Sequence, residues 1–298
     1  MTEWQWEEIA KHAGLTEGPA WDGSGLLYNE CAAHTTFRWD PATGKSSAWR
    51  SKTGAANGMV FDRNGNLYAC EGDAHRVTKV DAKNPDAEPE VIAGNFGGET
   101  LNWPNDIAVT GSGRVYFSDP NYNRSVPNNL PHESVYLAEH SFGGAWNLTR
   151  VTYDTRKPNG VLLSQDERTL FVADSPSDPT INSLLLAYPV RDNGTLGDAS
   201  VLFDFGQGRG IDGMTLTTDG KIVATAGSSR GGPGSMIYVF EQSGLVRSTH
   251  HAPADMPTNC TFGGSALNEL FVTFGTGYVY RVPNTGMQGH LAYPQRRY

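Results

Sequence analysis

The chain has 298 residues, of which 38% are hydrophobic, and a formal net charge of −9 at neutral pH. This acidic balance argues against a nucleic-acid partner, because phosphates require a basic face. No apolar run of about 18 residues is available for a membrane span, and the opening stretch MTEWQWEEIA lacks the pattern of a secretion signal. Three cysteines without metal-ligand spacing are typical of reduced thiols, so we expect a cytoplasmic protein. The sequence carries no signal for an oligomeric state.

The first predicted element covers residues 4–12, WQWEEIAKH. These residues could form a short helix, but we predict a strand. The last repeat of the chain, described below, has only YVYRVP after its hairpin and lacks an outer strand. An N-terminal strand would complete that unit and close a ring, which leaves only short and protected sheet edges.

From residue 17 onward the sequence repeats one plan: a polar residue, a short apolar run, a tight polar turn and a second apolar run. The copies start 40 to 54 residues apart and cover 17–31, 57–72, 105–120, 159–175, 212–227 and, most faintly, 260–275. Turns such as RNGN and GSGR supply the Gly and Asn residues that tight hairpins need. Further strand-like segments follow the hairpins, for example HRVTKVD at 75–81 and PEVIAGNF at 89–96.

Strand-containing repeats of about 40 to 50 residues are typical of propeller blades. No long helical apolar stripe interrupts the pattern, and no linker divides it. Six blades need nearly all of the 298 residues. The sequence therefore predicts an all-β fold in which residues 1–298 form a single six-bladed β-propeller domain with a central channel. The N-terminal segment is expected to close the last blade.

The residue that begins each repeat is predicted to lie where an innermost strand starts, so that the six form a ring at one end of the channel. These residues are Glu17, Asn57, Asn105, Asn159, Asp212 and Cys260. Four of them, Glu17, Asn105, Asn159 and Asp212, offer oxygen donors with two negative charges, a set that suits a hard divalent cation such as Ca²⁺ or Mg²⁺. Asn and Asp also favour turns at strand starts, which is the alternative explanation for any one position.

Two other patterns have structural explanations. Acids end several second strands, at Glu71, Asp119 and Asp174, and we expect them to form hydrogen bonds between blades. GSSRG at 227–231 matches the G-x-S-x-G pattern of hydrolase nucleophiles, but no helix is predicted after it. Ser229 is therefore not expected to be a nucleophile.

Five motifs resemble those of the SMP-30/gluconolactonase/luciferin-regenerating-enzyme family, in the same order and over nearly the whole chain. They are EGPAW at 17–21, PNDIAV at 104–109, PNG at 158–160, IDG at 211–213 and TNCTFGG at 258–264. The resemblance implies a six-bladed β-propeller with one divalent metal ion in its channel. It assigns the metal to Glu17, Asn105, Asn159 and Asp212, the same four residues that the repeats select. Ca²⁺ is the expected ion, with Mg²⁺, Mn²⁺ and Zn²⁺ as alternatives.

Characterised members of this family are mostly lactonases, so the resemblance implies hydrolysis of a lactone, with a sugar lactone of carbohydrate metabolism as the expected substrate. A metal ion would polarise the lactone carbonyl and stabilise the oxyanion that forms when water attacks. Asp212 is the expected catalytic residue, either as the base that accepts a proton from the water or as a nucleophile. A bound cation lowers the pKa of a carboxylate and weakens it as a base, so both routes remain open.

Three residues are candidates for contact with the substrate. Asn105 is one, because in some lactonases of the family the matching Asn lies nearer the substrate than the metal. Sugar lactonases that resemble this chain often carry an Arg two residues before that Asn, where this sequence has Trp103. An indole favours a less polar substrate or stacks against a sugar ring. Asn57 is the third candidate.

Two other functional classes remain. One is a phosphotriesterase-like hydrolase that uses the same metal site. The other is a propeller that binds partners and catalyses nothing, although a scaffold has no need of converging oxygen donors. The lactonase interpretation requires a small-molecule lactone as the partner, and neither a nucleic acid nor a membrane.

Overall fold

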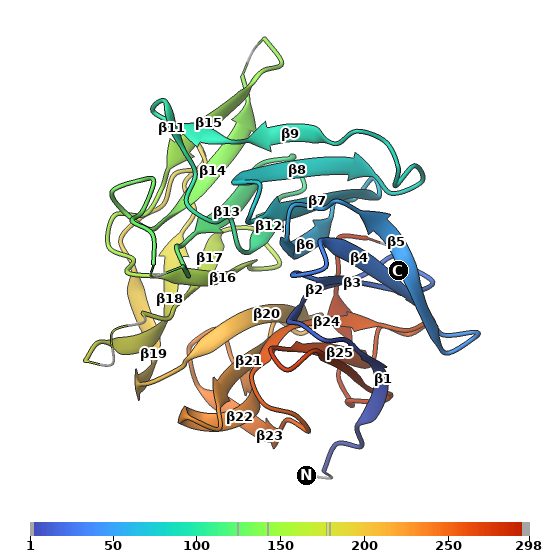
Figure 1. Ribbon diagram of the computed structural model, residues 1–298. Helices are drawn as coiled ribbons and strands as arrows, with labels where there is room; N and C mark the ends of the chain where they lie inside the picture. The colour runs from blue at the N-terminus through green and yellow to red at the C-terminus, as the bar shows by residue number, and fades with distance from the viewer. Residues whose placement is uncertain (1–2, 124, 142, 177, 179, 294–298) are drawn as a thin grey trace.

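The computed structural model describes residues 3–123, 125–141, 143–176, 178 and 180–293. Within these ranges every regular element is a strand, and none is a helix that could span a membrane. Six sheets of four or five strands surround a common centre (Figure 1). The predicted all-β, six-bladed β-propeller is therefore confirmed.

Each of the first three blades is an antiparallel sheet whose first strand lies nearest the centre (Figure 1). Blade one contains β2 (Thr16–Trp21), β3 (Leu26–Glu30), β4 (Thr35–Asp40) and β5 (Lys45–Ser51). Blade two contains β6 (Ala56–Phe61), β7 (Asn66–Glu71), β8 (Arg76–Asp81) and β9 (Glu90–Ala93). Blade three contains β12 (Ile107–Val109), β13 (Val115–Asp119), β14 (Ser134–His140) and β15 (Trp146–Arg150). A small two-stranded sheet, β10 (Asn95–Phe96) with β11 (Glu99–Thr100), lies between blades two and three in the chain.

The other three blades follow the same plan. Blade four contains β16 (Pro158–Leu163), β17 (Thr169–Asp174), β18 (Asn182–Pro189) and β19 (Ser200–Gln207). Blade five contains β20 (Ile211–Thr217), β21 (Ile222–Ser228), β22 (Gly231–Phe240) and β23 (Val246–His251). Blade six contains β24 (Pro257–Gly263), β25 (Glu269–Phe274) and β26 (Tyr278–Val282) from the C-terminal part of the chain, together with β1 (Glu7–Lys11) from its N-terminal part.

Both end regions of the chain are paired into the ring. β1 pairs antiparallel with β26, so that Glu8 lies opposite Tyr280 as the outer strand of blade six. The short strand β27 (Gly289–His290) pairs with β20, with His290 opposite Leu216, and gives blade five a fifth, innermost strand. The sequence pattern did not indicate β27, because two residues are too few to show an alternation.

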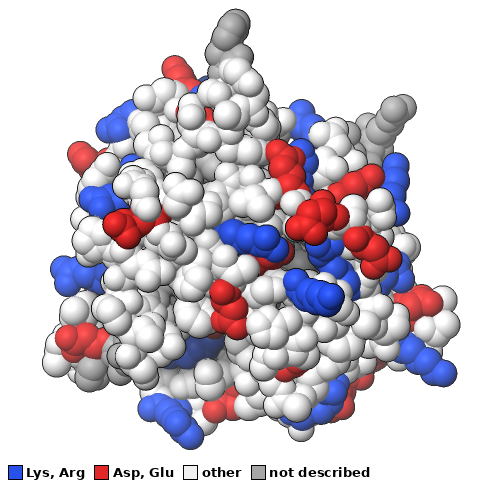
Figure 2. Space-filling model, turned by 45° about the horizontal axis from the view of Figure 1, so that its top comes forward, with Lys and Arg blue, Asp and Glu red and all other residues white. Residues whose placement is uncertain are grey.

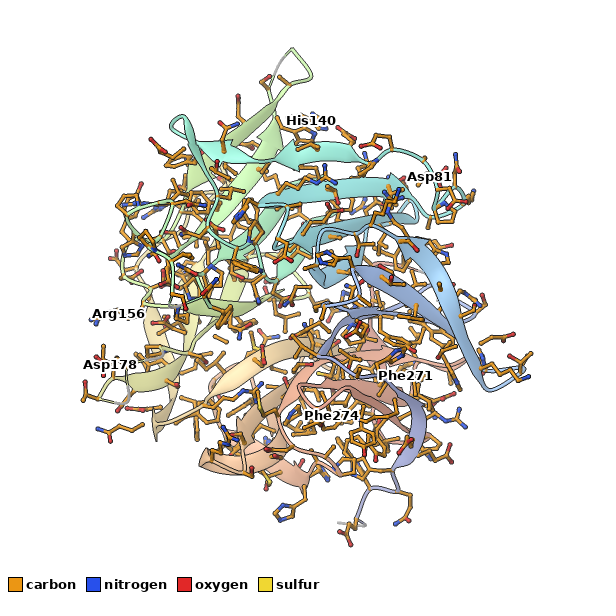
Figure 3. The ribbon with its side chains drawn as sticks, viewed as in Figure 1. Asp81, His140, Arg156, Asp178, Phe271 and Phe274 are labelled. Atoms are coloured by element: carbon orange, nitrogen blue, oxygen red, sulfur yellow. The ribbon has the colours of Figure 1, made fainter. Side chains whose placement is uncertain are left out.

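The hydrophobic core lies between neighbouring blades. Phe271 and Phe274, both on β25 (Figure 3), belong to different clusters. Phe271 packs with Trp21 and Trp39 of blade one, whereas Phe274 belongs to the cluster that includes Val223 of blade five. Residues an odd number apart on a strand face opposite sides of a sheet, so each blade packs against both neighbours and closes the ring.

One predicted ring position is wrong. On the inner strands of blades four, five and six, pairing with the second strand shifts register directly after Pro158, Ile211 and Pro257. The residues that follow are Asn159, Asp212 and Thr258, so the sixth ring position is Thr258 and not Cys260. Four residues further on, Leu216 pairs with Ile222 across five residues, whereas Phe262 pairs with Leu270 across seven. Equal spacing from the second strand therefore displaced the prediction by two.

Candidate metal and substrate site

A cavity of about 810 Å³ lies among the residues at the starts of the inner strands. Its volume falls within the range of about 300 to 1,000 Å³ that small-molecule sites occupy. The cavity brings together every residue predicted for the site, namely Glu17, Asn57, Trp103, Asn105, Asn159 and Asp212, and Thr258 supplies the sixth ring position. Figure 2 shows Lys, Arg, Asp and Glu side chains interspersed over the face that it presents, without a continuous basic surface.

Backbone irregularities turn the ring side chains toward the cavity. The pairing of β16 with β17 shifts register between Pro158 and Val161, so Asn159 lies in a bulge. A bulge re-aims side chains locally. Gly160 permits close approach of the next blade, because a Cβ at this position would lie 2.3 Å from the backbone oxygen of Asp212.

Hydrogen bonds between blades then hold the ring backbone in place. The carbonyl oxygen of Asn159 accepts a hydrogen bond from Ser118 Oγ at 2.6 Å. The carbonyl of Asn57 accepts one from Asn29 Nδ2 at 2.7 Å, and that of Thr258 accepts one from Thr225 Oγ1 at 2.8 Å. In each case the donor belongs to the preceding blade. These hydrogen bonds fix the backbone of three ring residues, Asn57, Asn159 and Thr258, all of which line the cavity.

The acids at the ends of the second strands fix the segments that lead into the ring. Asp119 accepts hydrogen bonds from the backbone N–H groups of Asn102 (2.9 Å) and Trp103 (2.8 Å). Asp174 likewise accepts them from Arg156 and Lys157 at 2.9 Å and 2.7 Å.

Each of these contacts lies within one blade. Glu71 follows the same rule, because it accepts from Arg76 and Thr78 of its own blade. The expectation that Glu71, Asp119 and Asp174 bond between blades is therefore wrong. The second strand of a blade instead anchors chain segments of that blade.

Replacing Asp119 with Ala is expected to lower the free energy of unfolding by about 1 to 3 kcal/mol, because it leaves one buried and one part-buried backbone donor without acceptors. Urea unfolding measures this change. Asp81→Ala is the matched control, since Asp81 is exposed and also ends a strand, and its effect should stay within about 0.5 kcal/mol. Equal effects in the two variants would contradict the anchoring role of Asp119.

Two carboxylates meet in the cavity. Glu17 is 3% exposed, and its Oε2 accepts a hydrogen bond from Gly18 N at 3.0 Å. Burial raises the pKa of Glu17 well above 4.5, and the negative charge of Asp212 raises this pKa further. Burial also raises the pKa of Asp212, while Arg209 and a hydrogen bond from Asn159 act in the opposite direction. The site therefore favours a bound cation that compensates two adjacent negative charges.

The chemistry of this donor set fits a hard divalent cation. Glu17 and Asp212 contribute carboxylate oxygens, while Asn105 and Asn159 line the same cavity with amide oxygens. Across the part of the chain that the structure describes, no group of three or more His, Cys, Asp or Glu side chains could hold a metal ion. A site on this ring must therefore draw on amide oxygens as well as on its two acids.

Arg209 is a site residue that the sequence analysis missed. It lines the cavity, and its Nη2 contacts Asp212 Oδ2 in an ion pair. The signal was present as GQGRG at 206–210, directly before the IDG motif. It was overlooked because the family's Arg was sought two residues before Asn105, whereas this Arg enters the cavity from the start of blade five.

Apolar side chains form part of the cavity wall. Trp103 lies edge-to-face with His75, whose Nδ1 donates a hydrogen bond to the Asn102 carbonyl at 2.5 Å. Tyr122, which is 42% exposed, and Met256 also line the cavity. The wall therefore offers aromatic surface next to the carboxylate and amide groups of the ring, which suits a cyclic substrate of mixed polarity.

The arrangement of blades and ring defines the class to which the protein belongs. Residues 15–276 match the family described as the SMP-30/Gluconolactonase/LRE-like region. The chain is therefore a member of this family, and the resemblance predicted from its motifs is confirmed.

Individual relatives include proteins named gluconolactonase and proteins named regucalcin. Gluconolactonase of Zymomonas mobilis is 28% identical over 289 residues, which cover 86% of this chain and 75% of the relative. Regucalcin of Xenopus laevis is 24% identical over 316 residues, which cover 92% of each chain.

Solved structures similar to this chain also include a gluconolactonase and a regucalcin. A gluconolactonase from Xanthomonas campestris superposes with a TM-score of 0.79 at 26% identity and covers 94% of this chain and 89% of its own. A regucalcin from Agrobacterium tumefaciens, described as a calcium-binding protein, has a TM-score of 0.76 at 16% identity, with 98% of each chain covered. At that identity the second likeness shows the fold alone.

Proposed function

We propose that the protein is a divalent-metal-dependent lactonase that opens the ring of a sugar lactone in carbohydrate metabolism. The observation that carries this proposal is the convergence of Glu17 and Asp212, two buried carboxylates, with two amide side chains in one cavity. The gluconolactonase relatives support the same reaction class.

Four residues would hold the metal ion: Glu17, Asn105, Asn159 and Asp212. Ca²⁺ is the preferred ion, because all four ligands are oxygens and the set carries two negative charges; Mg²⁺, Mn²⁺ and Zn²⁺ are alternatives. When bound, the cation supplies Lewis-acid polarisation of the lactone carbonyl.

Asp212 carries the proton transfer in this proposal. Its Oδ2 contacts Arg209, so Oδ1 is the oxygen available to accept a proton from the attacking water. The water oxygen bonds to the carbonyl carbon, the ring C–O bond breaks, and Asp212 returns the proton to the departing ring oxygen. The product is one hydroxy acid per lactone and water. Direct attack by Asp212, followed by hydrolysis of the acyl-enzyme, is the alternative route.

Neighbouring residues would position the ring. Trp103 offers its indole face to the apolar side of the sugar, and Asn57 and Asn105 supply hydrogen bonds to its hydroxyl groups. All three line the cavity beside Asp212.

Comparing substrates tests the reaction class. Sugar lactones are expected to have a kcat/KM at least about 100-fold higher than that of phosphotriesters such as paraoxon, since a planar ester and a tetrahedral phosphorus centre require different placement of ligands around the reacting atom. Initial rates with both substrate sets on the same metal-loaded enzyme measure this ratio. A ratio below one would favour the phosphotriesterase-like alternative, and no turnover of either set would favour a binding propeller.

A further inference from the structure

Arg209 is the one Lys or Arg among the described residues that line the cavity. Three acceptors hold its guanidinium. Nη1 donates to the carbonyl of Gly227 at 2.5 Å, while Nη2 donates to the carbonyl of Pro257 at 2.9 Å and contacts Asp212 Oδ2. The two carbonyls belong to blades five and six, so Arg209 is fixed across the boundary between these blades.

The local backbone is built to present this side chain. Gly208 has a φ of 118°, a conformation that side-chain-bearing residues rarely adopt. Its carbonyl accepts a hydrogen bond from Ser183 Oγ at 2.7 Å, and the carbonyl of Gly210 accepts one from Gly227 N at 3.1 Å. The residues on both sides of Arg209 are therefore held in place, which favours one fixed orientation of the guanidinium.

The ion pair has a consequence for any cation that binds the ring. Arg209 already occupies one carboxylate oxygen of Asp212, and Asn159 donates a hydrogen bond to the same side chain. A divalent cation that binds Asp212 must share this carboxylate with a guanidinium, and two positive charges at close range repel each other in a poorly solvated site. The surrounding acids reduce this repulsion without removing it.

We infer that Arg209 is a positioning residue of this active site: it fixes Asp212 through Oδ2, leaves the other oxygen for chemistry, and weakens metal binding as a result. This inference rests on the proposed metal-dependent function. The resemblance led us to seek an Arg two residues before Asn105, where this chain has Trp103. The guanidinium in this cavity belongs instead to Arg209, at the start of blade five.

Calorimetric titration with Ca²⁺ at pH 8 on chelator-treated protein tests the inference without using activity. Arg209→Met keeps the apolar stem and removes the charge, so it should bind Ca²⁺ at least about tenfold more tightly than the wild type. Arg209→Lys keeps the charge and should remain within about threefold of the wild type. Arg230→Met is the matched control, because Arg230 is exposed in the β21–β22 turn, and its affinity should not change.

Kinetics supply the second readout. Arg209→Met should lower kcat for a sugar lactone at least about tenfold while KM changes less than about threefold, the pattern of an interaction that matters in the transition state. Arg209→Lys should recover part of kcat. A merely structural role would lower metal affinity and activity together and would not give tighter Ca²⁺ binding.

The outcomes separate this inference from the proposed function. If the wild type binds Ca²⁺ and turns over lactones, but Arg209→Met binds Ca²⁺ equally or more weakly, the inference is wrong and the function stands. If the wild type neither binds a metal ion nor turns over lactones, both are wrong. If Arg209→Met shows no cooperative thermal unfolding transition and is therefore not folded, Arg209→Gln replaces it. Arg209→Gln must then show the same gain in Ca²⁺ affinity.

Discussion

Asp212→Ala is expected to lower kcat for lactone hydrolysis by at least about a thousandfold, because a positioned base contributes about 10² to 10⁴ to the rate and the variant also loses one of the four proposed metal ligands. The fold should persist, since the side chain of Asp212 faces a cavity and the blades are held by separate apolar clusters. Acid release from the lactone measures turnover, and circular dichroism with thermal unfolding measures the fold.

Asp73→Ala is the matched control for this prediction. Asp73 also lines the cavity, but it lies outside the ring and pairs with His34 at 3.5 Å. Its loss should change kcat less than about tenfold, as expected for a group that takes no part in the chemistry. Near-normal activity in Asp212→Ala would remove Asp212 from the mechanism.

Glu17→Gln is expected to weaken Ca²⁺ binding at least about tenfold, because affinity in oxygen-ligand sites depends on the number of charged ligands. The substitution keeps the shape of the side chain and removes one charge. Titration of the chelator-treated protein measures the affinity. Glu30→Gln is the control, since Glu30 is also buried in blade one but does not line the cavity.

The stability of the metal-free variant distinguishes loss of a ligand from loss of folding. Burial and Asp212 raise the pKa of Glu17 in the folded protein. At pH values above the ordinary glutamate pKa of 4.5, ionisation of Glu17 therefore lowers the free energy of unfolding of the metal-free protein. An uncharged Gln at this position does not. Metal-free Glu17→Gln should unfold at the same temperature as the metal-free wild type or higher at pH 8. Unchanged Ca²⁺ affinity in this variant would show that Glu17 is not a ligand of the cation.

Much of the fold was predictable because the propeller repeats its chemistry. A polar residue and a hairpin recur in each blade, so the repeats could be aligned on Glu17, Asn57, Asn105, Asn159 and Asp212. All five line the cavity. The placement of Cys260 failed because a lengthened turn changed the spacing in one blade: Phe262 pairs with Leu270 across seven residues, whereas Leu216 pairs with Ile222 across five.

The rest depends on contacts that have no period in the sequence. Arg209 reaches Asp212 from a glycine-rich loop, and its position is set by carbonyls of two blades. β27 pairs with β20 only after the chain has passed through blade six. The acids at Asp119 and Asp174 recur with the repeat, but only the structure shows that they bind segments of their own blades.

The most direct test of the account is acid release in a pH-stat from five- and six-membered sugar lactones, with spontaneous hydrolysis subtracted. The protein is assayed as purified, after chelation, and after addition of Ca²⁺, Mg²⁺, Mn²⁺ or Zn²⁺. The account predicts turnover that disappears with the metal and returns when a divalent ion is restored, with Ca²⁺ among the effective ions. Turnover that is unaffected by chelation, or no turnover above background with any ion, would contradict it.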